Sequence, residues 1–139
     1  MTTWTRSRSP ARRTGWAGER GAASIQMAAL MPVLFLIMFT GLQAALYSYA
    51  STVAAAAAQD GARAAAAYTG SVTGNLTAGT TAANSALQQS HGSLTNYTVT
   101  AAGTAGGATV TVSGEALSVV PGLTFTVSRS ATWPWEALS

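Results

Sequence analysis

The sequence predicts an α+β protein in which one long N-terminal helix is followed by a short second helix and a small three-stranded antiparallel sheet. Two observations predict the long helix: no charged residue stands between Arg20 and Asp60, and alanine, the best helix former, dominates the residues that follow this apolar segment. A third observation predicts the sheet, because apolar and polar residues alternate with a period of two in the last third of the chain. At 139 residues, the chain has the length of about one small domain.

The first part of the long helix is apolar enough to cross a membrane. Ala, Leu, Met, Phe, Ile and Val dominate residues 25–49, and about 20 predominantly apolar residues suffice to span the hydrocarbon core. We therefore predict a transmembrane helix over residues 22–50. Pro32 predicts a kink or a loosened turn in this helix. Tyr47 and Tyr49 fall where the outer interface would lie, which suits their amphipathic rings.

The positive charges of the chain are gathered before this apolar segment. Only 8% of the residues are charged, against about a quarter in ordinary soluble domains. The arginines that precede the segment are Arg6, Arg8, Arg12, Arg13 and Arg20. Because Lys and Arg are enriched on the cytoplasmic side of membrane helices, we predict a cytoplasmic basic leader over residues 1–21 and an extracytoplasmic domain over residues 51–139. A basic tail could also contact nucleic acid, but the adjacent apolar run favours the cell membrane as the partner.

A secretory signal peptide is the main alternative to a permanent anchor. Small residues after the apolar run, such as Ala54 and Ala56, could form a cleavage site. The apolar region of a signal peptide is about 7 to 15 residues long, and this one is longer. The length therefore favours an anchored protein over a secreted one.

The helix is expected to continue outside the membrane over residues 51–68. This stretch contains an alanine run at residues 54–58, and Asp60 with Arg63 at a spacing of three would form a surface ion pair. Small side chains also recur at alternating spacings of four and three, at Gly41, Ala45, Ser48, Thr52 and Ala55. Small faces let helix backbones approach closely in a membrane, so this stripe predicts a helix-packing surface. A chain so rich in alanine also produces such stripes by chance.

The remaining residues predict a second helix and three strands. Leu76, Ala83 and Leu87 share one helical face, which predicts a short helix over residues 75–89, although Gly79 favours a later start. The apolar residues that alternate with polar ones are Tyr97, Val99 and Ala101, then Val110 and Val112, then Leu123, Phe125 and Val127. Residues 103–107 predict the turn between the first two strands, and Pro121 with Gly122 predicts a longer loop before the third. The outer half of the long helix is expected to cover the sheet.

The residue types that carry chemistry are scarce. The chain has no cysteine and one histidine, His91, which stands in a predicted turn next to Gly92. A paired-carboxylate mechanism has no support, because Glu115 and Glu136 are far apart in the sequence. We therefore expect no catalytic, cofactor-binding or metal-binding residues, no small-molecule substrate, and a protein that is not an enzyme.

Several short motifs together resemble one known family. They are Arg20-Gly21-Ala22-Ala23-Ser24-Ile25-Gln26, Pro32 eleven residues after Gly21, the leucine-rich helix, Gln59-Asp60-Gly61-Ala62-Arg63, and Val120-Pro121-Gly122-Leu123 before an alternating strand. In this order and spacing they resemble the TadE-like proteins of the tight-adherence (Flp-type) pilus system, in particular actinobacterial members. The resemblance covers roughly residues 21–133.

This resemblance implies a type IV pilin-like architecture and a role as a minor pseudopilin or assembly component of a tight-adherence pilus or a related secretion system. It also implies pilin-like or pilus assembly proteins as partners, and cleavage by a prepilin peptidase after Gly21, which would leave Ala22 as the new N-terminus. Gln26 stands where the family usually has glutamate. Because glutamine cannot neutralise the ammonium group of a neighbouring subunit, we do not expect efficient polymerisation as a major subunit.

The leading prediction is thus a membrane-anchored protein that acts by helix packing and not by catalysis. The alternatives are an anchored surface binding module unrelated to pili, and a secreted protein released by signal peptidase. The state of the N-terminal helix in the mature protein separates the secreted alternative from the two anchored ones. Neighbouring genes for a pilus assembly ATPase and an inner-membrane platform would favour the pilus protein over the binding module.

Overall fold

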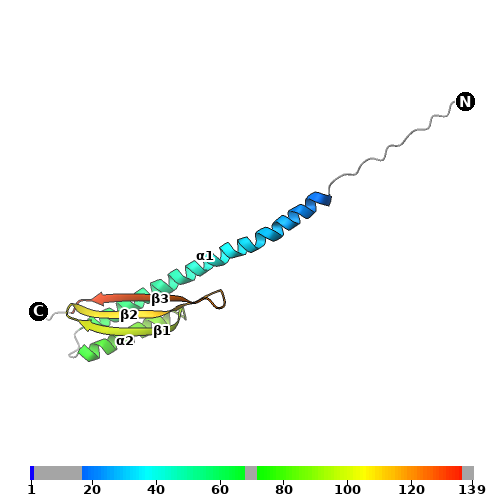
Figure 1. Ribbon diagram of the computed structural model, residues 1–139. Helices are drawn as coiled ribbons and strands as arrows, with labels where there is room; N and C mark the ends of the chain where they lie inside the picture. The colour runs from blue at the N-terminus through cyan, green and yellow to red at the C-terminus, as the bar shows by residue number, and fades with distance from the viewer. Residues whose placement is uncertain (2–16, 68–71, 136–139) are drawn as a thin grey trace. The chain divides into compact units, whose positions relative to one another are not determined.

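The computed structural model confirms the predicted α+β fold. It describes residues 1, 17–67 and 72–135, with the backbone alone for residues 17–23 and 72–74. The helices are α1 (Ala17–Ala66) and α2 (Val72–Gln89), and the strands are β1 (Leu94–Thr104), β2 (Gly107–Ala116) and β3 (Phe125–Trp133). Figure 1 shows these elements along the chain.

Helix α1 is continuous over 50 residues and includes Pro32, where the sequence predicts a kink or a loosened turn. The chain divides into two compact units, Met1–Ile37 and Met38–Ser139, and α1 contributes residues to both. The second unit contains the last part of α1 together with α2 and the sheet. It therefore forms the folded domain of the chain.

The sheet is an antiparallel meander with the strand order β1-β2-β3. Strands β1 and β2 form a hairpin in which Thr104 pairs with Gly107, so only Ala105 and Gly106 make the turn. This confirms the turn predicted at residues 103–107. The third strand starts later than predicted: Leu123 lies in the loop before β3 because the chain turns at Pro121 and Gly122, and Gly122 has a φ of 85°.

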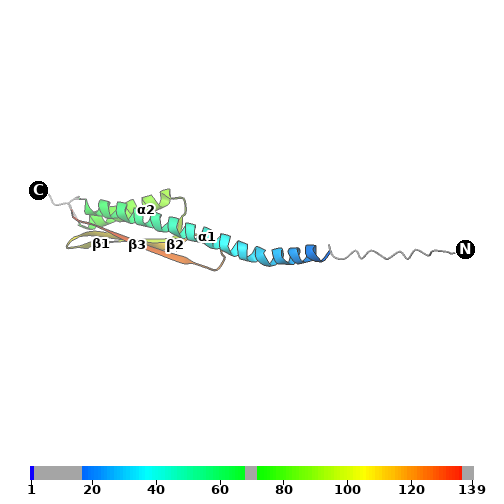
Figure 2. The same cartoon turned by 90° about the horizontal axis from the view of Figure 1, so that it is seen from above.

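The core of the second unit lies between the sheet and the two helices. Figure 2 shows α1 and α2 on the same face of the sheet. The largest fully buried side chains are Val110, Val112 and Val127, all from the sheet. Helix α1 contributes small side chains to this core, namely Ala50, Ala54, Ala57, Ala58, Ala62, Ala65 and Ala66. The C-terminal part of the long helix therefore covers the sheet, as the sequence predicts.

Helices α1 and α2 are in close contact at two glycines. A Cβ atom added at Gly61 would lie 2.8 Å from the carbonyl oxygen of Gly79 and 2.9 Å from the Cβ of Ala83. A Cβ added at Gly79 would lie 2.6 Å from the Cβ of Ala65. The expectation that Gly79 delays the start of the second helix is therefore wrong. Glycine lowers helix propensity, but here it lets α2 pack directly on α1, and α2 begins at Val72.

Candidate membrane span and assembly surface

The first part of α1 exposes large apolar side chains all around the helix. Their exposed fractions lie between 40% and 74%, and they are Ile25, Met27, Leu30, Met31, Val33, Leu34, Phe35, Leu36, Ile37, Met38, Phe39 and Leu42. Over this run the helix rises about 27 Å, close to the ~30 Å of a hydrocarbon core. An 18-residue window of α1 reaches a mean hydropathy of 2.1 with none of it buried. This N-terminal helix is therefore long and apolar enough to cross a membrane once.

From Gln43 onward, α1 has one buried face and one exposed face. Residues two apart on a helix point about 200° apart, and Ala50 is fully buried whereas Ser48 and Thr52 are exposed. The predicted small-residue stripe lies on the exposed face: Gly41, Ala45, Ser48 and Thr52 are exposed, and Ala55 is partly buried. A Cβ added at Gly41 would meet no atom within 4 Å. The packing of this stripe against another helix remains a prediction.

Gln43 joins α1 to the loop between β2 and β3. Its side chain is 9% exposed. The Nε2 atom donates a hydrogen bond to the carbonyl oxygen of Leu117 at 3.2 Å, and the Oε1 atom accepts one from the backbone N–H of Val119 at 2.9 Å. Sequence reasoning missed this role, because a lone glutamine after an apolar run gives no indication of a partner more than 70 residues away.

Two arginines connect α1 to β3. In Arg129, the Nε and Nη2 atoms donate hydrogen bonds to the Oγ atom of Ser51 at 2.8 and 2.6 Å. The guanidinium carbon of Arg63 lies 4.7 Å from the centre of the Trp133 ring, a cation–π geometry. The predicted ion pair between Asp60 and Arg63 is not formed. The Arg63 side chain extends over Trp133 instead. The Arg129–Ser51 and Arg63–Trp133 contacts together hold β3 against α1.

The residues predicted for topology and processing lie at the start of the chain. Arg6, Arg8, Arg12 and Arg13 fall outside the described residues. The structure describes Arg20, Gly21 and Ala22 as part of α1, by their backbone alone. The side chain of Gln26 is exposed. Cleavage after Gly21 is therefore still a prediction.

The described residues contain no group of three or more His, Cys, Asp or Glu side chains that could hold a metal ion. His91 is exposed in the turn after α2, with a φ of 51°. The Oε2 atom of Glu115 accepts a hydrogen bond from Nδ2 of Asn96 at 3.0 Å, next to the irregular pairing of β1 and β2 between Thr95 and Thr98. These side chains occupy structural positions in turns and strands and do not converge on one site.

The fold and the exposed apolar run together define a class: a small α+β domain that includes the C-terminal part of one helix long and apolar enough to span a membrane. The model of the family "TadE-like protein" matches residues 21–63. This match confirms, over that segment, the resemblance seen in the motifs. It covers the apolar run, the small-residue stripe and Gly61, and ends at Arg63. The comparisons with curated proteins and with solved structures gave no match.

Proposed function

We propose that this chain is a membrane-anchored TadE-like minor pseudopilin or assembly component of a tight-adherence (Flp-type) pilus or a related secretion system. It acts by packing of α1 against other pilin-like helices and carries out no catalysis. The observation that carries this proposal is that the segment matching the TadE-like family contains both the all-round apolar run and the exposed stripe. The proposed partners are the membrane, pilin-like or pilus assembly proteins, and prepilin peptidase.

The burial along α1 supports a permanent anchor over a secreted protein. Cleavage near Ala54 or Ala56 would cut α1 where it packs on the sheet, because Ala50, Ala54 and Ala57 are buried in the core. It would also remove Gln43, which holds the β2–β3 loop, and Ser51, which binds Arg129. A mature chain cut there would lose part of its own core, so the intact helix is the better functional form.

The direction of insertion follows from the arginines before α1. We propose that residues 1–21 lie on the cytoplasmic side and that the domain carrying the sheet lies outside, because basic flanks favour the cytoplasmic side. In this arrangement the exposed stripe lies at the level of the outer leaflet and continues a short way beyond the outer surface of the membrane. The hydroxyl of Thr52 donates to the carbonyl oxygen of Ser48 at 3.0 Å, so this polar group is already paired within the stripe.

Site-specific photocrosslinking tests the packing surface. The full chain is expressed in its natural host with a photoreactive amino acid at Ser48, on the stripe, or at Tyr47, a matched control one residue away. Both side chains are exposed, and they point about 100° apart on the helix. We expect covalent adducts with pilin-like or pilus assembly proteins from Ser48 and few from Tyr47. Equal yields at the two positions, or adducts with unrelated surface proteins alone, would contradict the proposal.

A further inference from the structure

The loop between β2 and β3, residues 117–124, is apolar and exposed. It contains no charged residue, since Glu115 and Arg129 are the nearest charges on either side. Three of its four large apolar side chains are exposed: Leu117 is 45% exposed, Val120 is 38% exposed and Leu123 is 51% exposed, whereas Val119 is partly buried. A loop that only connects two strands in water has no need of so many exposed apolar side chains.

The backbone of this loop has several of its hydrogen-bonding groups already paired. Gln43 binds the carbonyl oxygen of Leu117 and the N–H of Val119. The N–H of Val120 bonds to the hydroxyl of Ser118, and the carbonyl oxygen of Val120 accepts from that hydroxyl and from the N–H of Leu123. Pro121 has no N–H to satisfy. Paired backbone groups lower the cost of moving a segment out of water, so this loop can enter an apolar environment.

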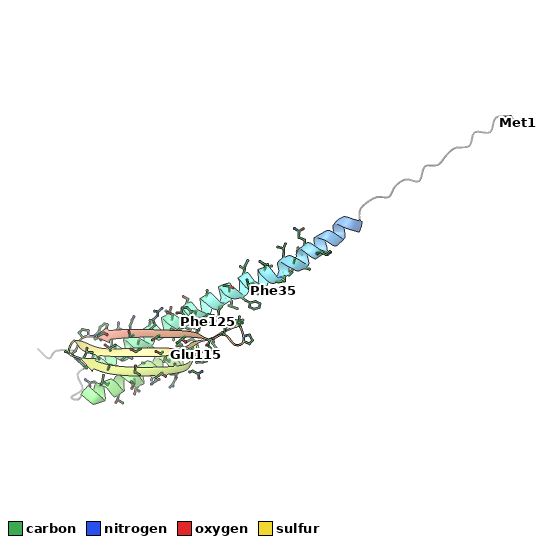
Figure 3. The ribbon with its side chains drawn as sticks, viewed as in Figure 1. Met1, Phe35, Glu115 and Phe125 are labelled. Atoms are coloured by element: carbon green, nitrogen blue, oxygen red, sulfur yellow. The ribbon has the colours of Figure 1, made fainter. Side chains whose placement is uncertain are left out.

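The loop is held at α1 where the apolar run ends. Gln43, which holds the loop, follows directly after Leu42, the last residue of the apolar run. Strand β3 runs in the same direction as α1, because Arg129 meets Ser51 and, further along both elements, Trp133 meets Arg63. The residues before β3 therefore lie toward the N-terminal end of the unit's helix. Figure 3 shows Phe125 at the start of β3, next to this projecting loop.

We propose that the β2–β3 loop is a second membrane contact, whose apolar tip at Val120 to Leu123 inserts into the outer lipid interface beside α1. The inference rests on the proposed membrane span. The occupant is lipid, because Gln43 holds the loop directly after Leu42, and Leu42, Met38 and Phe39 of the same unit are exposed apolar side chains of the proposed span. Two attachments to the bilayer, α1 and the loop, fix the orientation of the domain about the helix axis. The face of α1 with the small-residue stripe is thereby presented in one direction.

Fluorescence in lipid vesicles tests this contact. The chain has no natural cysteine, so one introduced cysteine gives a single labelling site. Full-length protein is reconstituted with an environment-sensitive nitrobenzoxadiazole label at Leu123→Cys or, separately, at Val120→Cys. Leu34→Cys, within the apolar run, is the control for lipid burial. Gly106→Cys, in the exposed β1–β2 turn at the opposite end of the sheet, is the control for water exposure.

We expect the emission at positions 123 and 120 to shift to shorter wavelength and to be quenched by lipids brominated near the headgroup end of the acyl chain. Gly106→Cys should show neither change. If Leu34→Cys is quenched by lipids brominated near the methyl end of the acyl chain while both loop positions behave as Gly106→Cys does, the loop proposal is overturned and the membrane span stands. If Leu34→Cys is not quenched even by lipids brominated near the methyl end of the acyl chain, the proposed span is wrong and the loop proposal fails with it. Protection of the loop positions only when pilus proteins are present would assign the loop to a protein partner and overturn the lipid contact.

Discussion

Gly61 and Gly41 lie on the same helix but in opposite surroundings. An added Cβ at Gly61 would contact the backbone of Gly79 and the side chains of Ala83 and Val110 at 2.8 to 3.0 Å, whereas one at Gly41 would meet nothing within 4 Å. Gly61→Ala gains helix propensity but overpacks the crossing of α1 and α2, and we expect the free energy of unfolding to fall by roughly 1 to 3 kcal/mol. The measurement is denaturant unfolding of the full chain in mild detergent, followed by near-ultraviolet circular dichroism.

Gly41→Ala is the matched control for this substitution. It gains the helix propensity of alanine, up to ~1 kcal/mol, without a clash, so the domain should be as stable as the wild type or more stable. Equal behaviour of the two variants would show that α1 and α2 do not cross at Gly61.

Arg63 and Trp133 should be energetically coupled. A double-mutant cycle of Arg63→Met and Trp133→Leu, measured by the same unfolding assay, is expected to give a coupling of about 0.5 to 1 kcal/mol, typical of an exposed cation–π pair. The control cycle uses Arg129→Met with Trp133→Leu. These two side chains are four residues apart on β3, roughly 13 Å along the strand, and should be additive within ~0.5 kcal/mol. A coupling near zero for the first cycle would mean that the stacking does not stabilise the domain.

At the scale of the elements, Gln43 is the polar connection between α1 and the β2–β3 loop. Gln43→Met keeps the size of the side chain but leaves the Leu117 carbonyl and the Val119 N–H without their partner, which costs about 1 to 3 kcal/mol for a buried group. We expect hydrogen exchange of the Val119 amide to accelerate roughly tenfold or more. Gln59→Met, at an exposed glutamine of the same helix, should leave this exchange rate unchanged. Equal protection of Val119 in both variants would exclude Gln43 as the residue that holds the loop.

The elements differ in how far the sequence predicted them. The strands were predictable because their alternation has the period of a half-buried strand, and the apolar run because no charge interrupts it. The start of α2 and the crossing at Gly61 and Gly79 were not predictable. A glycine lowers the helix propensity of its segment, and the sequence does not show that a neighbouring helix packs against it. Gln43, Ser51 and Arg129 were missed for the same reason: each depends on a partner more than 70 residues away.

At the scale of the whole molecule, one helix serves two functions in succession. Its first part exposes apolar side chains all around, as a membrane span requires, and its second part forms one wall of the domain core. The predicted boundaries at residues 21 and 50 stay predictions, and the compact domain includes helix residues from Met38 onward. A domain that depends on its own anchor for core residues is expected to be retained at the membrane with α1 intact.

The intact mass of the protein recovered from carbonate-washed membranes tests this account most directly. We expect the protein in the membrane pellet. Its mass should be that of a chain starting at Ala22 if prepilin peptidase cuts after Gly21, or at Met1 if that hypothesis is wrong. Both masses retain the whole apolar run and the helical wall of the core. Recovery in the soluble fraction, with the mass of a chain that starts near Ala54 or beyond, would contradict the anchored account.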